Sequence, residues 1–405
     1  MPNFKPIAIV GGGPAGALAA TTLARAGRSV ILFDEKLAWE KPCGGGVTHK
    51  ALVAWPFLRD ANVERNWVQK CELAGSSGRR VCFPLQQPIA IFSRTVLNGL
   101  VIEQARNAGA EIIRERILGI EPIDGGWRLR SAKSVWAADY LVFATGARNP
   151  FRKQFCGPVD AEDLMVTAGY RIPGRSEVMQ IQFLHDFHGY IWIFPRADHL
   201  SAGICGKMNA MTTRELRSVL ERALEKRGLD YHAAQFYSHV LPSPRANTLR
   251  EGKVSGDGWA MIGDAAGFVD PITGEGLYYA MRSGELLAEA LLDDQPERYP
   301  EFLRRDFLPE LELGAEMAVR FYTGRWMGET VIERTLQFIR SSASFRSLMS
   351  DLFAGTQGYR TLRRRLYRTL PTMLAESLAS ALHLPSSDSE VEAESRGIAA
   401  VLQRK

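Results

Sequence analysis

The 405-residue chain is 46% hydrophobic and 23% charged, the composition of an ordinary globular protein with about two or three domains. Its formal net charge of +5 is too small to indicate nucleic-acid binding by itself. The five cysteines include no C-x-x-C pair, which argues against a disulfide framework, a zinc site and an iron–sulfur cluster.

The first elements of the chain predict a dinucleotide-binding motif. Residues 7–10 indicate a strand, residues 17–26 a helix, and residues 29–33 a second strand that ends at Asp34. Three glycines between the first strand and the helix are spaced G-x-G-x-x-G: Gly11, Gly13 and Gly16. This spacing permits a tight turn, close approach of a pyrophosphate and close packing of the helix on the strand. The carboxylate of Asp34 is placed to accept hydrogen bonds from an adenosine ribose. The alternative is a glycine-rich turn without a ligand.

The next stretch combines a glycine-rich loop with further sheet elements. Residues 41–48 contain Pro42 and three consecutive glycines, which indicate either a close backbone approach to a ligand or a flexible surface loop. A helical pattern runs over residues 93–105. Residues 110–120 and 140–144 each predict a strand. The chain is therefore predicted to return to the parallel sheet after the long stretch that follows the second strand.

The middle of the chain predicts a second domain. Residues 165–207 alternate apolar and polar positions, as antiparallel strands do, and residues 212–227 predict a helix. This domain is expected to contain a mixed or antiparallel sheet. The chain then returns to the first domain at residues 259–267, and residues 277–292 predict a helix. Residues 297–384 are nearly all helical in pattern.

The C-terminal region carries a local positive charge. Apolar side chains recur there at helical spacing and arginines occupy the positions between them: Tyr359, Leu362, Leu366, Leu370, Arg360, Arg363, Arg364, Arg365 and Arg368. No acidic residue occurs from Leu352 to Ala375. This pattern favours either a basic amphipathic helix at a membrane surface or the solvated face of a helix packed on the body.

Three stretches within about residues 5–295 resemble one family. Residues 41–46 match a P-C-G-G loop, residues 263–277 match a long Gly-Asp segment, and residues 190–195 match a Y-x-W-x-F-P pattern followed by Gly203. With the N-terminal glycines, they resemble the geranylgeranyl reductases among the FAD-dependent oxidoreductases built like p-hydroxybenzoate hydroxylase. The resemblance implies an α/β fold with a Rossmann-like FAD-binding domain, a mixed or antiparallel-sheet substrate domain and a helical C-terminal region.

The resemblance also implies FAD as the cofactor. Asp264 is then expected to bind the ribityl hydroxyls, or else to cap the following helix, and Arg94 to contact FAD, or else to be a surface charge. The helix after Gly276 is expected to direct its N-terminal dipole at the anionic reduced flavin. The full set of expected cofactor residues is Gly11, Gly13, Ala15, Gly16, Asp34, Cys43, Gly44, Gly46, Arg94, Ile117, Gly263, Asp264, Gly274, Gly276 and Leu277.

The implied reaction is reduction of C=C bonds in a polyprenyl chain of the geranylgeranyl type. NADPH or another donor would reduce the flavin, hydride would pass to one alkene carbon, and an acid, either Cys43 or a water, would protonate the other. Alternatively, Cys43 only packs beside the ring. Tyr190, Trp192 and Phe194 share one strand face, which suits either a pocket for a long apolar substrate or a plain hydrophobic core.

Two other functions are open to the same scaffold. One is a flavin monooxygenase or halogenase, and the other is a membrane-associated flavoprotein that passes electrons to a quinone. Two positions also depart from the family pattern. Thr145 stands where many relatives have an Asp that contacts the nicotinamide donor or the flavin pyrophosphate. Cys205 stands where the family pattern has the second Gly of the G-x-G that begins at Gly203. Three histidines lack supporting ligands at metal-binding spacing, so no metal is expected: His185, His188 and His199.

The expected domain division follows from these assignments: an FAD-binding domain at 1–75, 93–164 and 251–295, a substrate domain at 76–92 and 165–250, a helical region at 296–384 and a disordered tail at 385–405. No apolar run is long enough to cross a membrane, and little chain precedes the first strand, so we expect a cytoplasmic protein without a signal peptide. The expected partners are a hydrophobic prenyl substrate and a membrane surface at the Arg-rich helix, but no nucleic acid.

Overall fold

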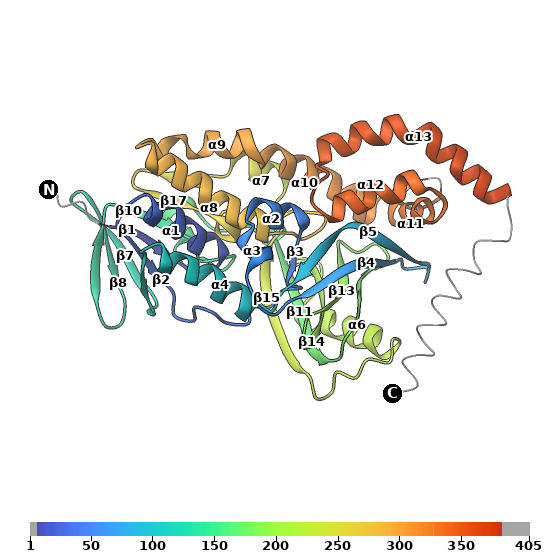
Figure 1. The fold of residues 1–405 in the computed structure, drawn as a ribbon, viewed down its shortest axis with the longest axis horizontal. Helices are drawn as coiled ribbons and strands as arrows, with labels where there is room; N and C mark the ends of the chain where they lie inside the picture. Colours follow the sequence, from blue (N-terminus) through green and yellow to red (C-terminus); the bar gives the residue numbers. More distant parts are fainter. Residues whose placement is uncertain (1–5, 327, 383–405) are drawn as a thin grey trace.

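The computed structural model describes residues 6–326 and 328–382. Figure 1 shows an elongated molecule with the N-terminal elements at one end and the C-terminal helices at the other. A six-stranded sheet and an eight-stranded sheet form the body. The tail predicted at residues 385–405 lies outside the described residues.

The six-stranded sheet is the Rossmann-like part predicted from the sequence. It contains β1 (Ile7–Val10), β2 (Val30–Phe33), β6 (Glu111–Ile113), β10 (Tyr140–Phe143), β16 (Ser255–Gly256) and β17 (Trp259–Met261). The strand order is β16-β17-β10-β1-β2-β6, and all neighbours are parallel except β16 and β17. Every residue of β1, β2 and β10 is buried, as in parallel sheets that are covered on both faces.

Three helices pack together on this sheet: α1 (Pro14–Arg25), α4 (Arg94–Asn107) and α8 (Leu277–Leu292). The first of them, α1, contacts both α4 and α8. It begins earlier than predicted because Pro14 occupies the first turn, where a missing N–H costs nothing. A Cβ at Gly284 would lie only 2.5 Å from the Ala15 carbonyl oxygen, so α8 needs this glycine to approach α1.

The single strand predicted at residues 110–120 is wrong. The observed β6 ends at Ile113 because its partner β2 ends at Phe33, so no further backbone is available for pairing. The chain then enters a separate three-stranded sheet formed by β7 (Gly119–Ile123), β8 (Gly126–Arg130) and β9 (Val135–Ala138).

The eight-stranded sheet is the mixed sheet predicted for the second domain. It contains β3 (Gly46–Val47), β4 (Asn66–Ala74), β5 (Arg80–Ile91), β11 (Leu164–Pro173), β12 (Val178–Phe183), β13 (Gly189–Pro195), β14 (His199–Lys207) and β15 (Gln235–Pro242). Its order is β15-β11-β14-β13-β12-β4-β5-β3, with β12 and β4 parallel and the other neighbours antiparallel. Helix α6 (Thr213–Glu225) packs on β11 and β14. Because β4 precedes residue 76, this sheet starts earlier in the chain than the expected substrate domain.

The C-terminal region is helical as predicted, apart from a hairpin of β18 (Arg325–Trp326) and β19 (Glu329–Thr330). Its helices are α9 (Tyr299–Asp306), α10 (Leu308–Thr323), α11 (Val331–Ser341), α12 (Ala343–Phe353) and α13 (Tyr359–Leu382). One apolar core joins β4, β5 and β12 to helices α10 to α13. Short helices complete the described chain: α2 (His49–Ala54), α3 (Phe57–Asp60), α5 (Arg152–Cys156), α7 (Ala246–Glu251) and single turns at Ala161–Asp163, Gly263–Ala265 and Pro296–Arg298.

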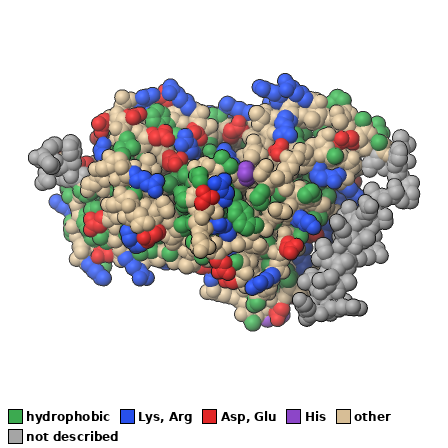
Figure 2. Space-filling view, in the orientation of Figure 1, with side chains coloured by type: hydrophobic (Ala, Val, Ile, Leu, Met, Phe, Trp, Pro, Cys, Tyr) green, Lys and Arg blue, Asp and Glu red, His purple; other side chains and the backbone are tan. Residues whose placement is uncertain are grey.

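The apolar stripe predicted along α13 divides into two parts. Tyr359 and Leu362 are buried against the body, whereas Leu370 is 40% exposed and Leu378 is 64% exposed. Figure 2 shows Lys and Arg side chains beside hydrophobic ones at the upper right, over the place of α13 in Figure 1. Within residues 6–326 and 328–382, no helix combines the length and apolarity that a membrane span requires.

Candidate active site

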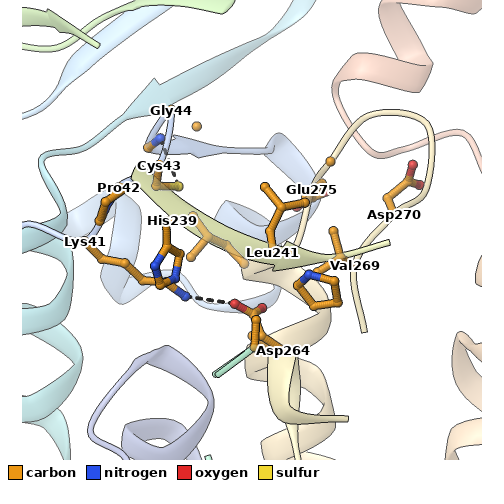
Figure 3. Close-up of a pocket in the computed structure, with 18 of the residues that line it drawn as sticks. Lys41, Pro42, Cys43, Gly44, His239, Leu241, Asp264, Val269, Asp270 and Glu275 are labelled. Carbon is orange, nitrogen blue, oxygen red and sulfur yellow. Dashed lines mark hydrogen bonds and ion pairs between the residues drawn. The ribbon is translucent and has the colours of Figure 1, made fainter. Parts of the chain in front are cut away.

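A cavity of about 340 Å³ lies where the carboxyl ends of the parallel strands face the eight-stranded sheet. The loops after β1, β2, β10 and β17 form one wall, and strands β11 to β15 form the other. Figure 3 shows Lys41 and Cys43 on one side of this cavity and Asp270 and Glu275 on the other. Open α/β sheets bind their ligands at this edge.

The predicted glycine turn is shaped for a phosphate group. Gly11 has a φ of 115°, and a Cβ there would lie 2.2 Å from the Ala144 carbonyl oxygen, so only glycine fits. Gly13 precedes the first turn of α1, and a Cβ there would meet nothing within 4 Å. The space above Gly13 is therefore open to the N-terminus of α1, where N–H groups and the helix dipole attract anions.

Asp34 holds the turn and faces the same cavity. Its Oδ2 accepts a 2.7 Å hydrogen bond from the Gly12 N–H, and its Oδ1 accepts bonds of 2.7 Å from the N–H groups of Lys36 and Leu37. Because a carboxylate has about four acceptor positions, one remains for a ribose hydroxyl. The predicted ribose contact thus fits the arrangement.

Arg94 is a buried cation, contrary to the alternative of a surface charge. It is 4% exposed, its Nη2 donates to Asn98 Oδ1 at 3.1 Å, and its Nε has no partner among the described residues. The side chain lines the cavity. A buried guanidinium with an unused donor suits an anionic group, such as a flavin pyrophosphate.

Asp264 is held beside a lysine. Its Oδ2 lies 2.8 Å from Lys41 Nζ, as the dashed line in Figure 3 marks. Burial raises the pKa of Asp264, but Lys41 and Arg94 outweigh this effect and leave it below its ordinary value. The carboxylate therefore stays ionised and can accept hydrogen bonds from hydroxyl groups. Neither Gly263–Ala265 nor α8 has a side-chain cap bond, so the capping alternative is not observed.

The Cys43 loop is fixed by a network that the sequence analysis missed. Arg196 donates to the Cys43 carbonyl oxygen at 2.5 Å, Ser201 Oγ donates to the same oxygen at 3.0 Å, and Arg196 pairs with Glu40. Burial raises the pKa of the Cys43 thiol, but Arg94 and Arg196 outweigh it, so the net pKa is lowered. The thiol is consequently more acidic than an ordinary cysteine.

His239 is a second cavity residue that the sequence analysis missed. Burial, and then Lys41, lower the pKa of His239 to about 4, so the imidazole is neutral near pH 7. Its Nε2 has no partner among the described residues. No sequence pattern around His239 indicates a role for it. Lys41 and Arg196, in contrast, directly adjoin the motif residues Pro42 and Pro195, so their positions beside these motifs could have identified them as site residues.

The three predicted aromatic residues line the cavity from β13. Trp192 is buried, with its Nε1 3.4 Å from Ser201 Oγ, while Tyr190 and Phe194 are half-buried. Phe194 lies against the glycine loop, because a Cβ on Gly44 would be 2.6 Å from its ring. Cys205 is 2% exposed, packs with Trp192 and lines the same side of the cavity. These side chains therefore form a cavity wall as well as core.

A second cavity of about 340 Å³ adjoins the first. It lies between β12 and helices α10 to α13, and its lining is apolar apart from a few groups such as Arg320. Six residues line both cavities: Ile181, Tyr190, Ile272, Thr273, Leu352 and Phe353.

The cavity gathers most of the predicted cofactor residues. Those on its walls are Gly11, Gly13, Ala15, Asp34, Cys43, Gly44, Gly46, Arg94, Asp264, Gly274, Gly276 and Leu277. Three others are not on them: Gly16, Ile117 and Gly263. Gly16 serves packing, because a Cβ there would lie 2.0 Å from the Gly11 carbonyl oxygen, and Ile117 is buried in the core.

Comparisons with known proteins agree with this geometry. Residues 5–165 match the pyridine nucleotide-disulphide oxidoreductase family. A chloroplastic geranylgeranyl diphosphate reductase from Arabidopsis thaliana is 26% identical over 71% of this chain and 65% of its own length. A digeranylgeranylglycerophospholipid reductase from Methanosphaerula palustris is 28% identical over 71% of this chain and 76% of its own length. The match thus spans just under two thirds of the Arabidopsis protein.

Solved structures share the whole architecture. A geranylgeranyl bacteriochlorophyll reductase-like protein from Thermoplasma acidophilum has a TM-score of 0.72 at 19% identity, covering 90% of this chain and 99% of that one. Halogenases crystallised with FAD also have this fold. FAD is therefore the cofactor that the family match and the fold imply, and Gly13, Arg94 and Asp264 are placed where they would hold it. The chain is an FAD-dependent oxidoreductase, and the comparisons confirm its resemblance to the geranylgeranyl reductases.

Proposed function

We propose that this enzyme reduces C=C bonds in a geranylgeranyl-type chain. The observation that carries the proposal is the second cavity, which continues from the flavin site and has the apolar lining that a long prenyl chain requires. The relatives named for geranylgeranyl substrates support the same class. Among the described residues that line this cavity, Arg320 is the charged side chain. It is exposed and would pair with an anionic head group of the substrate.

We further propose that Cys43 supplies the proton to the alkene. FAD, when bound, supplies hydride chemistry. Arg94 and Arg196 outweigh the effect of burial and lower the pKa of the Cys43 thiol, so the thiol gives up its proton more readily than an ordinary cysteine does. The aromatic wall at Tyr190 to Phe194 holds the apolar chain and excludes water, and NADPH is the proposed source of electrons.

A membrane surface is the proposed source of the substrate. Leu370, Leu374 and Leu378 are exposed at spacings of four along α13, and Arg363 and Arg364 are exposed on the same helix. Exposed leucines beside arginines suit an anionic lipid surface. The same helix lines the second cavity with Leu362 and Leu366, so this surface would lie beside the substrate cavity.

The test is mass spectrometry of purified holoenzyme incubated with a geranylgeranyl lipid and NADPH. We expect products heavier by pairs of hydrogens, and Cys43→Ser to reduce product formation by about 10²-fold or more while flavin reduction persists. If no prenyl compound gains hydrogen, the reductase assignment fails. Coupled oxygen uptake with a hydroxylated or halogenated product would favour the monooxygenase alternative, and turnover with quinones alone would favour the electron carrier.

A further inference from the structure

The loop from Asp270 to Gly276, which leads into α8, is bound by three tyrosine hydroxyls from separate elements. Tyr190 of β13 donates to the Thr273 carbonyl oxygen at 2.8 Å, and Tyr322 of α10 donates to the Ile272 carbonyl oxygen at 2.5 Å. Tyr359, the first residue of α13, lies 2.7 and 2.9 Å from the two carboxylate oxygens of Asp270. The loop lines the flavin cavity. The shape of this part of the cavity therefore depends on the bonds that the loop receives from β13, α10 and α13.

Asp270 connects the two ends of this loop. Its Oδ1 accepts from the N–H groups of Ile272 at 2.9 Å and Thr273 at 2.8 Å. Its own N–H donates to the Glu275 carbonyl oxygen at 2.7 Å, and its carbonyl oxygen accepts from the Gly274 N–H at 3.0 Å. Asp270 is 6% exposed, so its carboxylate depends on these donors and on Tyr359 for the solvation that water would otherwise give.

The packing around Tyr359 is equally specific. Tyr359 is 3% exposed, and a Cβ on Gly314 of α10 would lie 2.7 Å from its ring and 3.3 Å from Pro271. The glycine therefore lets the tyrosine ring lie between α10 and the loop. The close packing of the buried ring against α10 therefore keeps the hydroxyl at Asp270.

We propose that Tyr359 is a positioning residue for the flavin ring, acting through Asp270. From α13 it holds the loop whose Gly274 and Gly276 face the cavity and whose end is the N-terminus of α8. The loop is thereby preorganised for FAD, and less ordering remains when the cofactor binds. The proposal depends on FAD occupying this cavity and not on the prenyl substrate, so failure of the proposed reaction would leave it standing.

The test compares Tyr359→Phe with the wild-type holoenzyme. We expect FAD affinity, measured by titrating the apoprotein and following flavin fluorescence, to fall about tenfold. The visible absorption bands of the bound flavin should also shift, which a purely structural contact would not cause. Tyr367→Phe is the matched control, because Tyr367 lies on the same helix and is 68% exposed. It should leave affinity and spectrum unchanged.

An unchanged affinity and spectrum in Tyr359→Phe, with only a lower melting temperature, would overturn the proposal. If Tyr359→Phe does not fold, the pair Asp270→Asn and Asp270→Ala decides instead. Asparagine keeps an acceptor oxygen for the loop N–H groups and stays within reach of the tyrosine, whereas alanine removes both. We expect Asp270→Asn to bind FAD about tenfold more tightly than Asp270→Ala. Equal affinities of the two variants would refute the role of Asp270.

Discussion

The pairing of Glu40 with Arg196 yields a quantitative prediction about stability. Glu40 caps α4 by accepting from the N–H groups of Arg94 and Thr95, each at 3.0 Å, and from Ser93 Oγ at 2.6 Å. The Arg196 side chain is 2% exposed, so Glu40 is its main counter-charge. Replacing Glu40 by Gln keeps the size and one acceptor oxygen but leaves a buried guanidinium without its anion.

The pKa of Glu40 gives the magnitude. Burial raises this pKa, but Arg196 and the hydrogen bonds outweigh it and lower the value from an ordinary 4.5 to about 2. At about 1.4 kcal/mol per pH unit, this difference corresponds to about 3 kcal/mol of unfolding free energy. Because the folded-state pKa is the lower one, the stabilisation is complete above about pH 4.5 and is lost as the pH falls toward about 2.

Urea unfolding of the apoprotein at several pH values measures this effect. We expect Glu40→Gln to be less stable than wild type by about 3 kcal/mol near pH 7, with the gap closing as the pH falls below about 4.5. Glu64→Gln is the control, since Glu64 is exposed, and it should change little at any pH. A gap that is absent near neutral pH, or that stays constant on acidification, would refute the assigned ion pair.

Three further predictions concern the cofactor turn, the loop before α8 and the C-terminal helix. Gly13→Ala should leave the unfolding free energy within about 0.5 kcal/mol of wild type, because the new methyl meets no atom, yet weaken FAD binding in a fluorescence titration by about tenfold or more; normal FAD affinity would exclude a phosphate above Gly13. Burial raises the pKa of Glu275 from 4.5 to about 7, so wild type should lose stability as the pH rises from about 4.5 to about 7, and Glu275→Gln should not. Parallel stability curves of the two proteins in urea unfolding would contradict this buried environment of Glu275. Leu374→Asp should reduce co-sedimentation with anionic vesicles more than Thr372→Asp, which adds the same charge at another exposed site on α13; equal binding by both variants would remove the leucines from the lipid contact.

Local patterns predicted the parts of the fold that depend on neighbouring residues. The boundaries of α8, Leu277–Leu292, agree with the predicted 277–292 because a glycine precedes the helix and apolar spacing runs through it. The strand–turn–helix–strand unit was predicted for a similar reason: the turn conformation at Gly11 and the close packing at Gly16 both require glycine, and the sequence shows glycine there. The strand at residues 110–120 was wrong because its end depends on where its partner β2 stops, about 80 residues earlier in the chain.

The sequence by itself thus determined the fold class, the glycine turn and the resemblance to the geranylgeranyl reductases, since each rests on periodicity or motif spacing within a short segment. Only the tertiary structure decided that Arg196 fixes the Cys43 loop and that Tyr359 binds Asp270, which stands 89 residues before it. It also decided that α13 buries its first turn and exposes its later leucines. Such pairings depend on which surfaces pack together, and no local pattern records the partner of a side chain that lies far along the chain.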